Sequence, residues 1–257
     1  MTSRFSLDAD LKPEELQQRI LNTYINVRVG IGVLGMIFPF FLWLVGRFYA
    51  RLPLRSSISM YYHAVGYECR SLRDWFVGVL FVVGIFLFLY KGFSRAESWA
   101  LSIAGALAVG VAIFPMSLDA NKKFWFTLHG SCAIGLFLCM AFVVFFCADD
   151  TLALIHDTNI ANPARVIARL KLAYRIVGLG MALSVLAAYI LNAIPKSEYR
   201  TFWVETAGIC SFGIYWLLKS WELRKTDVDL KSARGLIRKT DGKLMSIAPK
   251  SNSPSQP

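Results

Sequence analysis

Six long hydrophobic segments, separated by polar connections, dominate the pattern of this chain. They cover residues 29–46, 75–90, 98–118, 124–148, 176–195 and 201–218. Four are uncharged, whereas the fourth contains His129 and the sixth contains Glu205. A helix needs about 20 residues to cross roughly 30 Å of hydrocarbon, and a flanking Lys91 extends the shortest segment because its ammonium reaches the membrane surface. The pattern predicts an all-α polytopic membrane protein, a bundle of six transmembrane helices.

Lys and Arg are distributed unevenly over the two sides that six spans would create. The side with both termini carries 19 of the 28 basic residues, and the other side carries nine. The positive-inside rule places the more basic side in the cytoplasm, so we expect both termini to be cytoplasmic. Five arginines in the first extracytoplasmic loop, residues 47–74, count against this orientation.

The two ends of the chain are polar. Residues 1–27 lack the apolar core of a cleaved signal peptide, and Pro13 before two glutamates is typical of a helix start, which predicts a cytoplasmic segment with a short surface helix. The transmembrane domain is expected at 28–219. In the tail, residues 220–257, basic and apolar residues alternate before a polar end, which favours an amphipathic helix on anionic lipid head groups followed by a disordered stretch.

Composition adds little beyond the membrane assignment. The hydrophobic fraction is 56%, above the roughly 45–50% of soluble domains. The basic loops and tail explain the net charge of +11, and no motif points to a nucleic-acid partner. The five cysteines include no C-x-x-C pair. Four glycines favour close helix packing, within the bundle or in a homo-oligomer: Gly178, Gly180, Gly208 and Gly213.

Under this orientation, the unusual polar residues lie at the extracytoplasmic ends of the helices. His129 and Glu205 are each five or six residues into their helices, which is roughly 7–9 Å at 1.5 Å per residue. Asp119 ends the third helix on the same side. Ionisable residues in such segments face a partner or a cavity, because lipid cannot satisfy them. We therefore predict an outward-facing polar pocket with the candidate ligand-binding residues Ser59, His63, Asp119, His129, Glu205, Arg73 and Asp74.

The first loop is the longest connection outside the membrane. Its aromatic Ser-Ile-Ser-Met-Tyr-Tyr-His run is unlike a flexible linker, so we expect a structured loop with a functional role. If residues 59–63 are helical, the four-residue spacing places Ser59 and His63 on one face.

Each candidate also has a purely structural interpretation. His63 is then solvated or caps a helix, and His129 is a buried residue hydrogen-bonded to a neighbouring helix. Glu205 is then paired with Arg200, Arg73 or Arg47, and Asp119 is an ordinary residue at a helix end.

Three functions remain open at this point. We favour a binding or sensing protein without enzymatic activity or cofactor, whose histidines make the pocket proton-responsive. An oligomeric transporter or channel is less favoured, because the chain shows no inverted repeat and no broken helices. The third is a metal-dependent intramembrane hydrolase acting on lipid.

The hydrolase interpretation rests on a resemblance. Ser59-x-x-x-His63, Asp119 and the later His129 are similar to the pattern of the ceramidase and adiponectin-receptor superfamily, whose members hold zinc with Ser-x-x-x-His, an Asp and a late His-x-x-x-His. The resemblance implies a divalent metal at His63, Asp119 and His129. The chain departs from the pattern in its sixth segment, which has Glu205 and no histidine.

A second resemblance concerns the layout. Ser57-Ile58-Ser59 between the first two segments, Phe114-Pro115 at the end of the third and His129-Gly130 at the start of the fourth resemble six-helix bacterial membrane proteins of uncharacterised activity, distantly similar to the DRAM/Sfk-type family. The likeness covers residues 28–219 and implies the fold and a place in the bacterial inner membrane. It implies no reaction.

Overall fold

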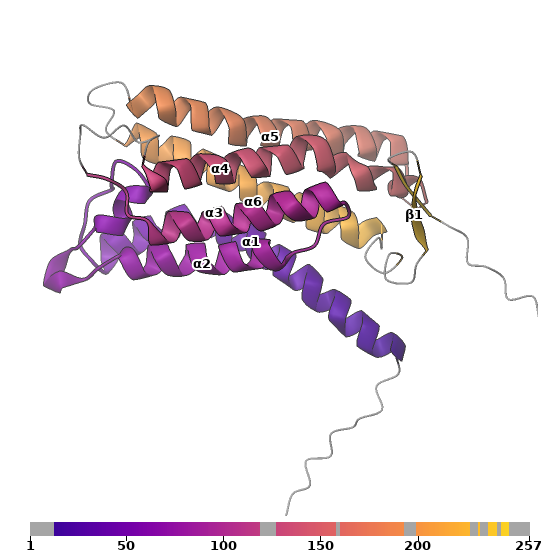
Figure 1. Ribbon diagram of the computed structural model, residues 1–257, viewed down its shortest axis with the longest axis horizontal. Coiled ribbons are helices and arrows are strands. Elements are labelled where there is room, and N and C mark those ends of the chain that lie inside the picture. The colour runs from indigo at the N-terminus through magenta and orange to yellow at the C-terminus, as the bar shows by residue number, and fades with distance from the viewer. Residues whose placement is uncertain are drawn as a thin grey trace, which may run out of the picture.

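The computed structural model describes residues 13–118, 127–157, 160–192, 199–226, 231, 236–240 and 243–246. In the part of the chain that the structure describes, helices and their connecting loops are accompanied by one short β-hairpin, and the main helices lie side by side in a bundle (Figure 1). These helices are α1 (Pro13–Phe48), α2 (Arg73–Leu89), α3 (Arg95–Ile113), α4 (Leu128–Phe142), α5 (Pro163–Asn192) and α6 (Arg200–Thr226). The all-α class predicted from the hydrophobic pattern is confirmed.

Within the described residues, four helical stretches are long and apolar enough to cross a membrane. They are Glu15–Phe48, Arg95–Ile113, Leu128–His156 and Pro163–Leu191. This composition suits a protein embedded in a membrane. Helix α2 is shorter, at 17 residues, and α6 carries charged residues toward its C-terminal end.

Successive helices run in opposite directions, which brings the connections to two ends of the bundle. The N-terminal part of α1 projects away from the other helices (Figure 1). Two glycine contacts set the closest helix approaches. A Cβ on Gly213 of α6 would lie 2.8 Å from the Gly32 carbonyl oxygen of α1, and a Cβ on Gly105 of α3 would lie 2.5 Å from the Gly84 carbonyl oxygen of α2. Hydrogen at these positions lets the backbones touch.

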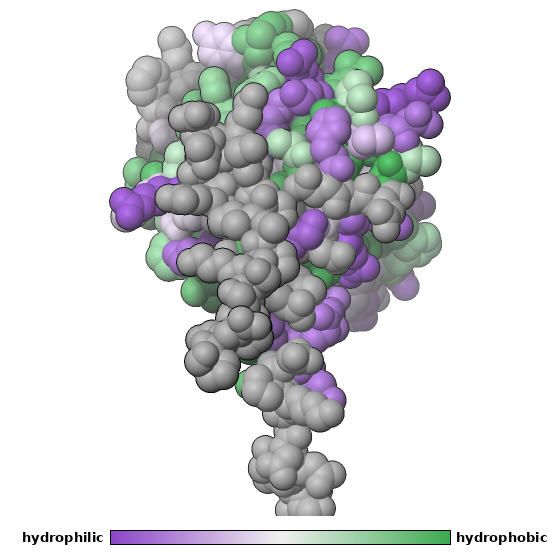
Figure 2. Space-filling view, turned by 90° about the vertical axis from the view of Figure 1, so that its right-hand side faces the viewer, coloured by the Kyte–Doolittle hydropathy of each residue, from purple (hydrophilic) through white to green (hydrophobic). Residues whose placement is uncertain are grey.

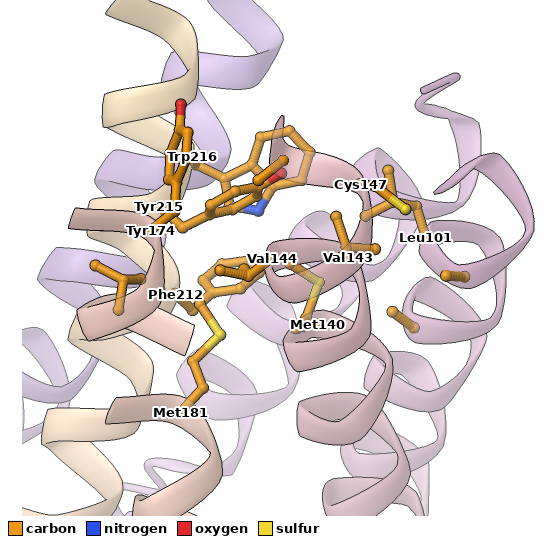
Figure 3. Close-up of a cluster of buried hydrophobic side chains, with 14 of the residues drawn as sticks. Leu101, Met140, Val143, Val144, Cys147, Tyr174, Met181, Phe212, Tyr215 and Trp216 are labelled. Atoms are coloured by element: carbon orange, nitrogen blue, oxygen red, sulfur yellow. The ribbon is translucent and has the colours of Figure 1, made fainter. Parts of the chain in front are cut away.

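The main hydrophobic core is formed by side chains from all six helices, α1 to α6. Figure 3 shows Met140, Val143 and Val144 of the fourth helical stretch facing Phe212 and Trp216 of α6. Trp216 is 2% exposed and stands edge-on to Tyr90 at the end of α2, with ring centroids 5.0 Å apart. A ring of this size fixes how α6 packs against the other helices.

The connection between α1 and α2 folds back on the bundle. It contains two 3-10 helices, η1 (Ser59–His63) and η2 (Tyr67–Cys69). The backbone N–H of Tyr67 donates to the Ala50 carbonyl at 2.9 Å, and that of Leu72 donates to the Ala64 carbonyl at 3.0 Å. The loop shares a second hydrophobic cluster with residues of α1, α2, α3 and α6, and Tyr61 is fully buried in it. Burial raises the pKa of the Tyr61 phenol, so this hydroxyl stays neutral.

The fourth helical stretch changes its hydrogen-bond pattern as it leaves α4. A π-helix, η4 (Val143–Cys147), follows α4 directly, and a 3-10 segment, η5 (Ala148–Asp157), follows η4. Single π turns inside helices are rare and concentrate at functional sites.

The C-terminal region differs from the predicted tail. Helix α6 continues to Thr226, and one face of its last two turns is buried in the bundle, namely Lys219, Ser220, Glu222, Leu223 and Thr226. Strands β1 (Ile237–Thr240) and β2 (Lys243–Ser246) then form an antiparallel hairpin where we expected an amphipathic helix. Viewed from the end at which β1 lies, the molecule shows many hydrophilic side chains (Figure 2). The predicted N-terminal surface helix is instead the continuous first part of α1.

Candidate functional site

Several predicted site residues meet at the end of the bundle where η1 lies. His129, in the first turn of α4, is fully buried. Its Nδ1 lies 2.9 Å from the Phe114 carbonyl oxygen at the end of α3, and its Nε2 lies 2.9 Å from Ser59 Oγ. Because a carbonyl can only accept, this arrangement places the ring proton on Nδ1, so Nε2 accepts from the Ser59 hydroxyl. The imidazole thus joins the loop to two helices.

Glu205 holds the same loop from α6. The backbone N–H of Ile58 donates to Glu205 Oε2 at 2.6 Å, and one turn earlier the Phe202 N–H donates to the Ser56 carbonyl at 2.8 Å. Within the described part of the chain, no ion pair joins Glu205 to an arginine. The structure therefore favours a loop anchor over the salt bridge considered for this residue.

His63 lies near the others and makes a different contact. Its Nε2 lies 2.7 Å from the Met116 carbonyl oxygen. Ser59 and His63 do not share a helical face, because η1 is a 3-10 helix with about three residues per turn, so four residues advance by about 120° beyond a full turn. The stacking expected for an α-helical loop is therefore wrong, and the two side chains reach different partners.

Two further candidates, Arg73 and Asp74, do not join this cluster. Arg73 and Asp74 are exposed in the first turn of α2, where the Arg73 guanidinium lies over the Tyr62 ring, 4.7 Å from its centroid. Asp119 lies outside the described residues. Among the residues that the structure describes, no group of three or more His, Cys, Asp or Glu side chains could hold a metal ion.

A narrow cavity lies directly beneath the cluster, between α1, α2, α3, α4 and α6. Its volume is about 120 Å³. Along α2 its wall extends from Phe76 to Leu87, which is about 16 Å at 1.5 Å per residue. Ser59 and Glu205 provide its polar wall atoms at one end, and the other lining residues are apolar, among them Leu80, Val83, Ala108, Val111, Leu136 and Met140. We call this space the central cavity.

A second, smaller hollow adjoins the central cavity. It has a volume of about 60 Å³ and is lined by Ile134 of α4, by Ser184, Val185 and Ala188 of α5, and by three residues that also line the central cavity, namely Ala133, Phe137 and Glu205. We call it the side cavity.

Sequence reasoning missed a second polar cluster at the opposite end of the bundle. Lys219 Nζ donates to the Ala148 carbonyl at 2.8 Å and to Thr151 Oγ1 at 2.6 Å, and it lies 3.2 Å from Glu222 Oε2. The hydroxyls of Thr151 and Tyr174 both donate to the Glu222 carboxylate. Glu222 is fully buried and Lys219 is 2% exposed. We call these five residues the Lys219–Glu222 cluster.

Two further ionisable side chains, those of Arg28 and Glu97, are buried at the same end of the bundle. Arg28 of α1 is fully buried, and its guanidinium lies 5.2 Å from the Tyr24 ring centroid and 5.6 Å from that of Tyr90. Glu97 of α3 is 3% exposed and accepts the Phe93 backbone N–H at 2.8 Å. This end of the bundle therefore buries two basic and two acidic side chains.

A local signal for the missed cluster exists in the sequence. Lys219 and Glu222 are three residues apart directly after a hydrophobic run, which is the spacing of an ion pair on one helical face. Their proximity to further basic residues suggested a surface tail instead.

Comparisons with protein families, with curated proteins and with solved structures gave no match for this chain. The two resemblances noted in the sequence therefore stay predictions.

Proposed function

We propose that this protein spans the membrane six times, with both termini in the cytoplasm, and that it binds or senses a ligand with an apolar body and a polar head. The apolar body lies in the central cavity, and the head meets Glu205 and Ser59. One observation carries this proposal, namely that a long apolar cavity ends at a carboxylate and a hydroxyl. Ligand sites commonly combine apolar walls with a few placed polar groups.

The energetics of the cavity support a ligand that is mainly apolar. Lipid tails are as apolar as the cavity wall, so an alkyl chain taken from the bilayer gains by close packing along this wall and not by leaving water. A head that donates a hydrogen bond to Glu205 adds direction, because bonds to charged groups contribute about 1.5–3 kcal/mol. A charged head with no such partner would oppose binding in this setting.

Glu205 also connects the ligand site to the loop between α1 and α2, and this connection supports a sensing function. Its carboxylate holds the Ile58 backbone, and the adjacent Ser59 hydroxyl donates to His129. A ligand head that donates to Glu205 shares this carboxylate with the Ile58 N–H. Occupancy of the cavity therefore shifts the loop between α1 and α2, a population shift set by the difference in ligand affinity.

The test uses n-hexylamine with a terminal trifluoromethyl group, whose short chain suits a cavity of about 120 Å³, observed by fluorine NMR on the protein in lipid nanodiscs. We expect a separate bound resonance for the wild type. Ala108→Phe fills the central cavity and should abolish that resonance. The matched control is Ala106→Phe, which adds the same ring at an exposed position of the same helix and should leave binding unchanged.

Glu205→Gln tests the head group separately. The amide oxygen can still accept from Ile58, whereas the charge is lost, so we expect affinity for the amine to fall about tenfold, the equivalent of about 1.4 kcal/mol. Wild-type protein with no bound resonance, or Ala108→Phe protein that binds like the wild type, would contradict the proposal.

A further inference from the structure

The central and side cavities are separated by a thin wall. Ala133 and Phe137 of α4 and Glu205 of α6 line both spaces. The Phe137 ring packs toward α6, where a Cβ on Gly208 would lie 3.3 Å from its Cε1 atom. One aromatic side chain and one carboxylate therefore stand between the two cavities.

The side cavity lies on the flank of the bundle, between α4 and α5. Its lining residues Ile134, Val185 and Ala188 are half-buried. Apolar neighbours on the same two helices are more than half exposed, with Leu138 at 58% and Leu186 at 53%. Such a surface faces lipid tails in a membrane, so this cavity is reached from the bilayer.

The opposite route, from water, is covered by the loop. Ile58 lines the central cavity at its polar end and is 3% exposed. Tyr61 and Tyr62 of η1 pack over the same region and are buried. A ligand arriving from water would have to displace this hydrophobic cluster, whereas a ligand arriving from the bilayer meets the Phe137 ring.

We propose that the ligand enters sideways from the bilayer, through the side cavity and past Phe137, and that it is a membrane-dissolved single-chain amphiphile whose head donates hydrogen bonds, such as a primary amine or an alcohol. This inference rests on the proposed function, because it assigns the route and the ligand class of the same site. One chain is specified because the central cavity is long and narrow.

The depth of the polar groups suits this route. Glu205 is in the second turn of α6, near the end of the bundle, so an amphiphile can keep its head at the level of the membrane interface while its chain moves inward. Ser184, the polar residue of the side cavity on α5, already donates to the Met181 carbonyl at 2.7 Å. Glu205 is therefore the first carboxylate that the head meets, and it is shared by both cavities.

Entry routes can be separated from binding sites by kinetics. A variant that blocks the route slows association and dissociation by the same factor and leaves the dissociation constant unchanged. The experiment measures exchange of the trifluoromethyl-hexylamine probe between bilayer and protein by fluorine NMR in nanodiscs. Ala188→Phe fills the side cavity without touching the central one. The control is Leu186→Phe, which adds a ring at an exposed position two residues away.

We expect Ala188→Phe to slow both rates at least tenfold at constant affinity, and Phe137→Ala to accelerate both. Leu186→Phe should behave like the wild type. If Ala188→Phe leaves both rates unchanged while the probe still binds in a manner sensitive to Ala108→Phe, lateral entry is wrong and the proposed function stands. If the wild type does not bind the probe, both proposals fail. If Ala188→Phe weakens affinity without slowing dissociation, the side cavity is part of the binding site and the entry route is wrong.

Discussion

At the scale of single residues, buried charge is the costliest feature of this protein. Lys219 and Glu222 have left water, and burial of an ion costs several kcal/mol unless its hydrogen bonds are replaced. The structure replaces these hydrogen bonds. The Ala148 carbonyl and the Thr151 hydroxyl oxygen accept from the ammonium, and the hydroxyls of Thr151 and Tyr174 donate to the carboxylate. The Ala148 carbonyl that accepts from Lys219 lies where the helix changes from π to 3-10 geometry.

Because the opposite charges of Lys219 and Glu222 compensate each other, we expect the effects of mutating them on stability to be non-additive. Lys219→Met leaves the carboxylate without its cation, so we expect the free energy of unfolding to fall by about 3–5 kcal/mol. The double variant Lys219→Met with Glu222→Gln removes both charges and should lose less than Lys219→Met alone. Reversible unfolding in mixed micelles measures these values. Glu222→Gln alone completes the cycle, and a loss in the double variant equal to the sum of the two single losses would show that the two charges are not coupled.

At this scale, the sequence predicted which residues lie near one another but not which atoms they contact. Sequence reasoning brought Ser59, His129 and Glu205 to one end of the bundle, because depth along a helix follows from counting residues. It could not give their partners. The bond between His129 and Ser59 joins residues 70 positions apart, and it depends on how the loop folds over the helix ends. Lys219 and Glu222 were missed because exposure of a charge is decided by neighbouring helices and not by local sequence.

At the scale of helices, glycine positions determine how closely pairs can approach. Gly84 and Gly78 both belong to α2, yet their surroundings differ. A Cβ on Gly84 would lie 2.9 Å from the Gly105 carbonyl oxygen of α3, whereas a Cβ on Gly78 would meet nothing within 4 Å. Gly178, Gly180, Gly208 and Gly213, which also suggested contacts with a second copy, all have neighbours within their own chain.

This difference predicts opposite outcomes for one substitution on one helix. Gly84→Ala pushes α2 away from α3, so we expect a loss of about 1–3 kcal/mol in the free energy of unfolding, as for other overpacked sites. Gly78→Ala should be neutral or slightly stabilising, because alanine loses less conformational entropy in a helix. Thermal unfolding of both variants in the same nanodiscs checks the pair. Equal behaviour would show that the α2–α3 contact does not limit stability.

Helix positions were more predictable than helix types. The hydrophobic runs gave the locations of the main helices, since bilayer thickness and chain rise fix their length. The π turn after Phe142 and the 3-10 helix at Ser59–His63 were not predictable, because such geometry reflects local packing more than periodicity. Consequently, the expected stacking of Ser59 on His63 failed although both residues lie at the site.

At the scale of the whole molecule, orientation decides which side receives a ligand. The loop between α1 and α2 and the hairpin of β1 and β2 lie at opposite ends of the bundle (Figure 1). The distribution of Lys and Arg predicts that the hairpin end faces the cytoplasm, although the five arginines near the first loop oppose it.

Cysteine labelling tests this orientation directly, because Cys69 is exposed in the first loop while Cys132, Cys139, Cys147 and Cys210 are half-buried or buried. We expect a membrane-impermeant maleimide to label Cys69 in intact cells, and Cys69→Ser to remove that label. In the Cys69→Ser background, Lys239→Cys on β1 should be labelled only after the membrane is permeabilised. If Lys239→Cys protein is labelled in intact cells and Cys69 of the parent chain is not, the orientation is the reverse of the predicted one. The loop, Glu205 and the central cavity then face the cytoplasm. Labelling of both positions in intact cells would contradict a location on opposite sides of the membrane and would exclude the six-span arrangement.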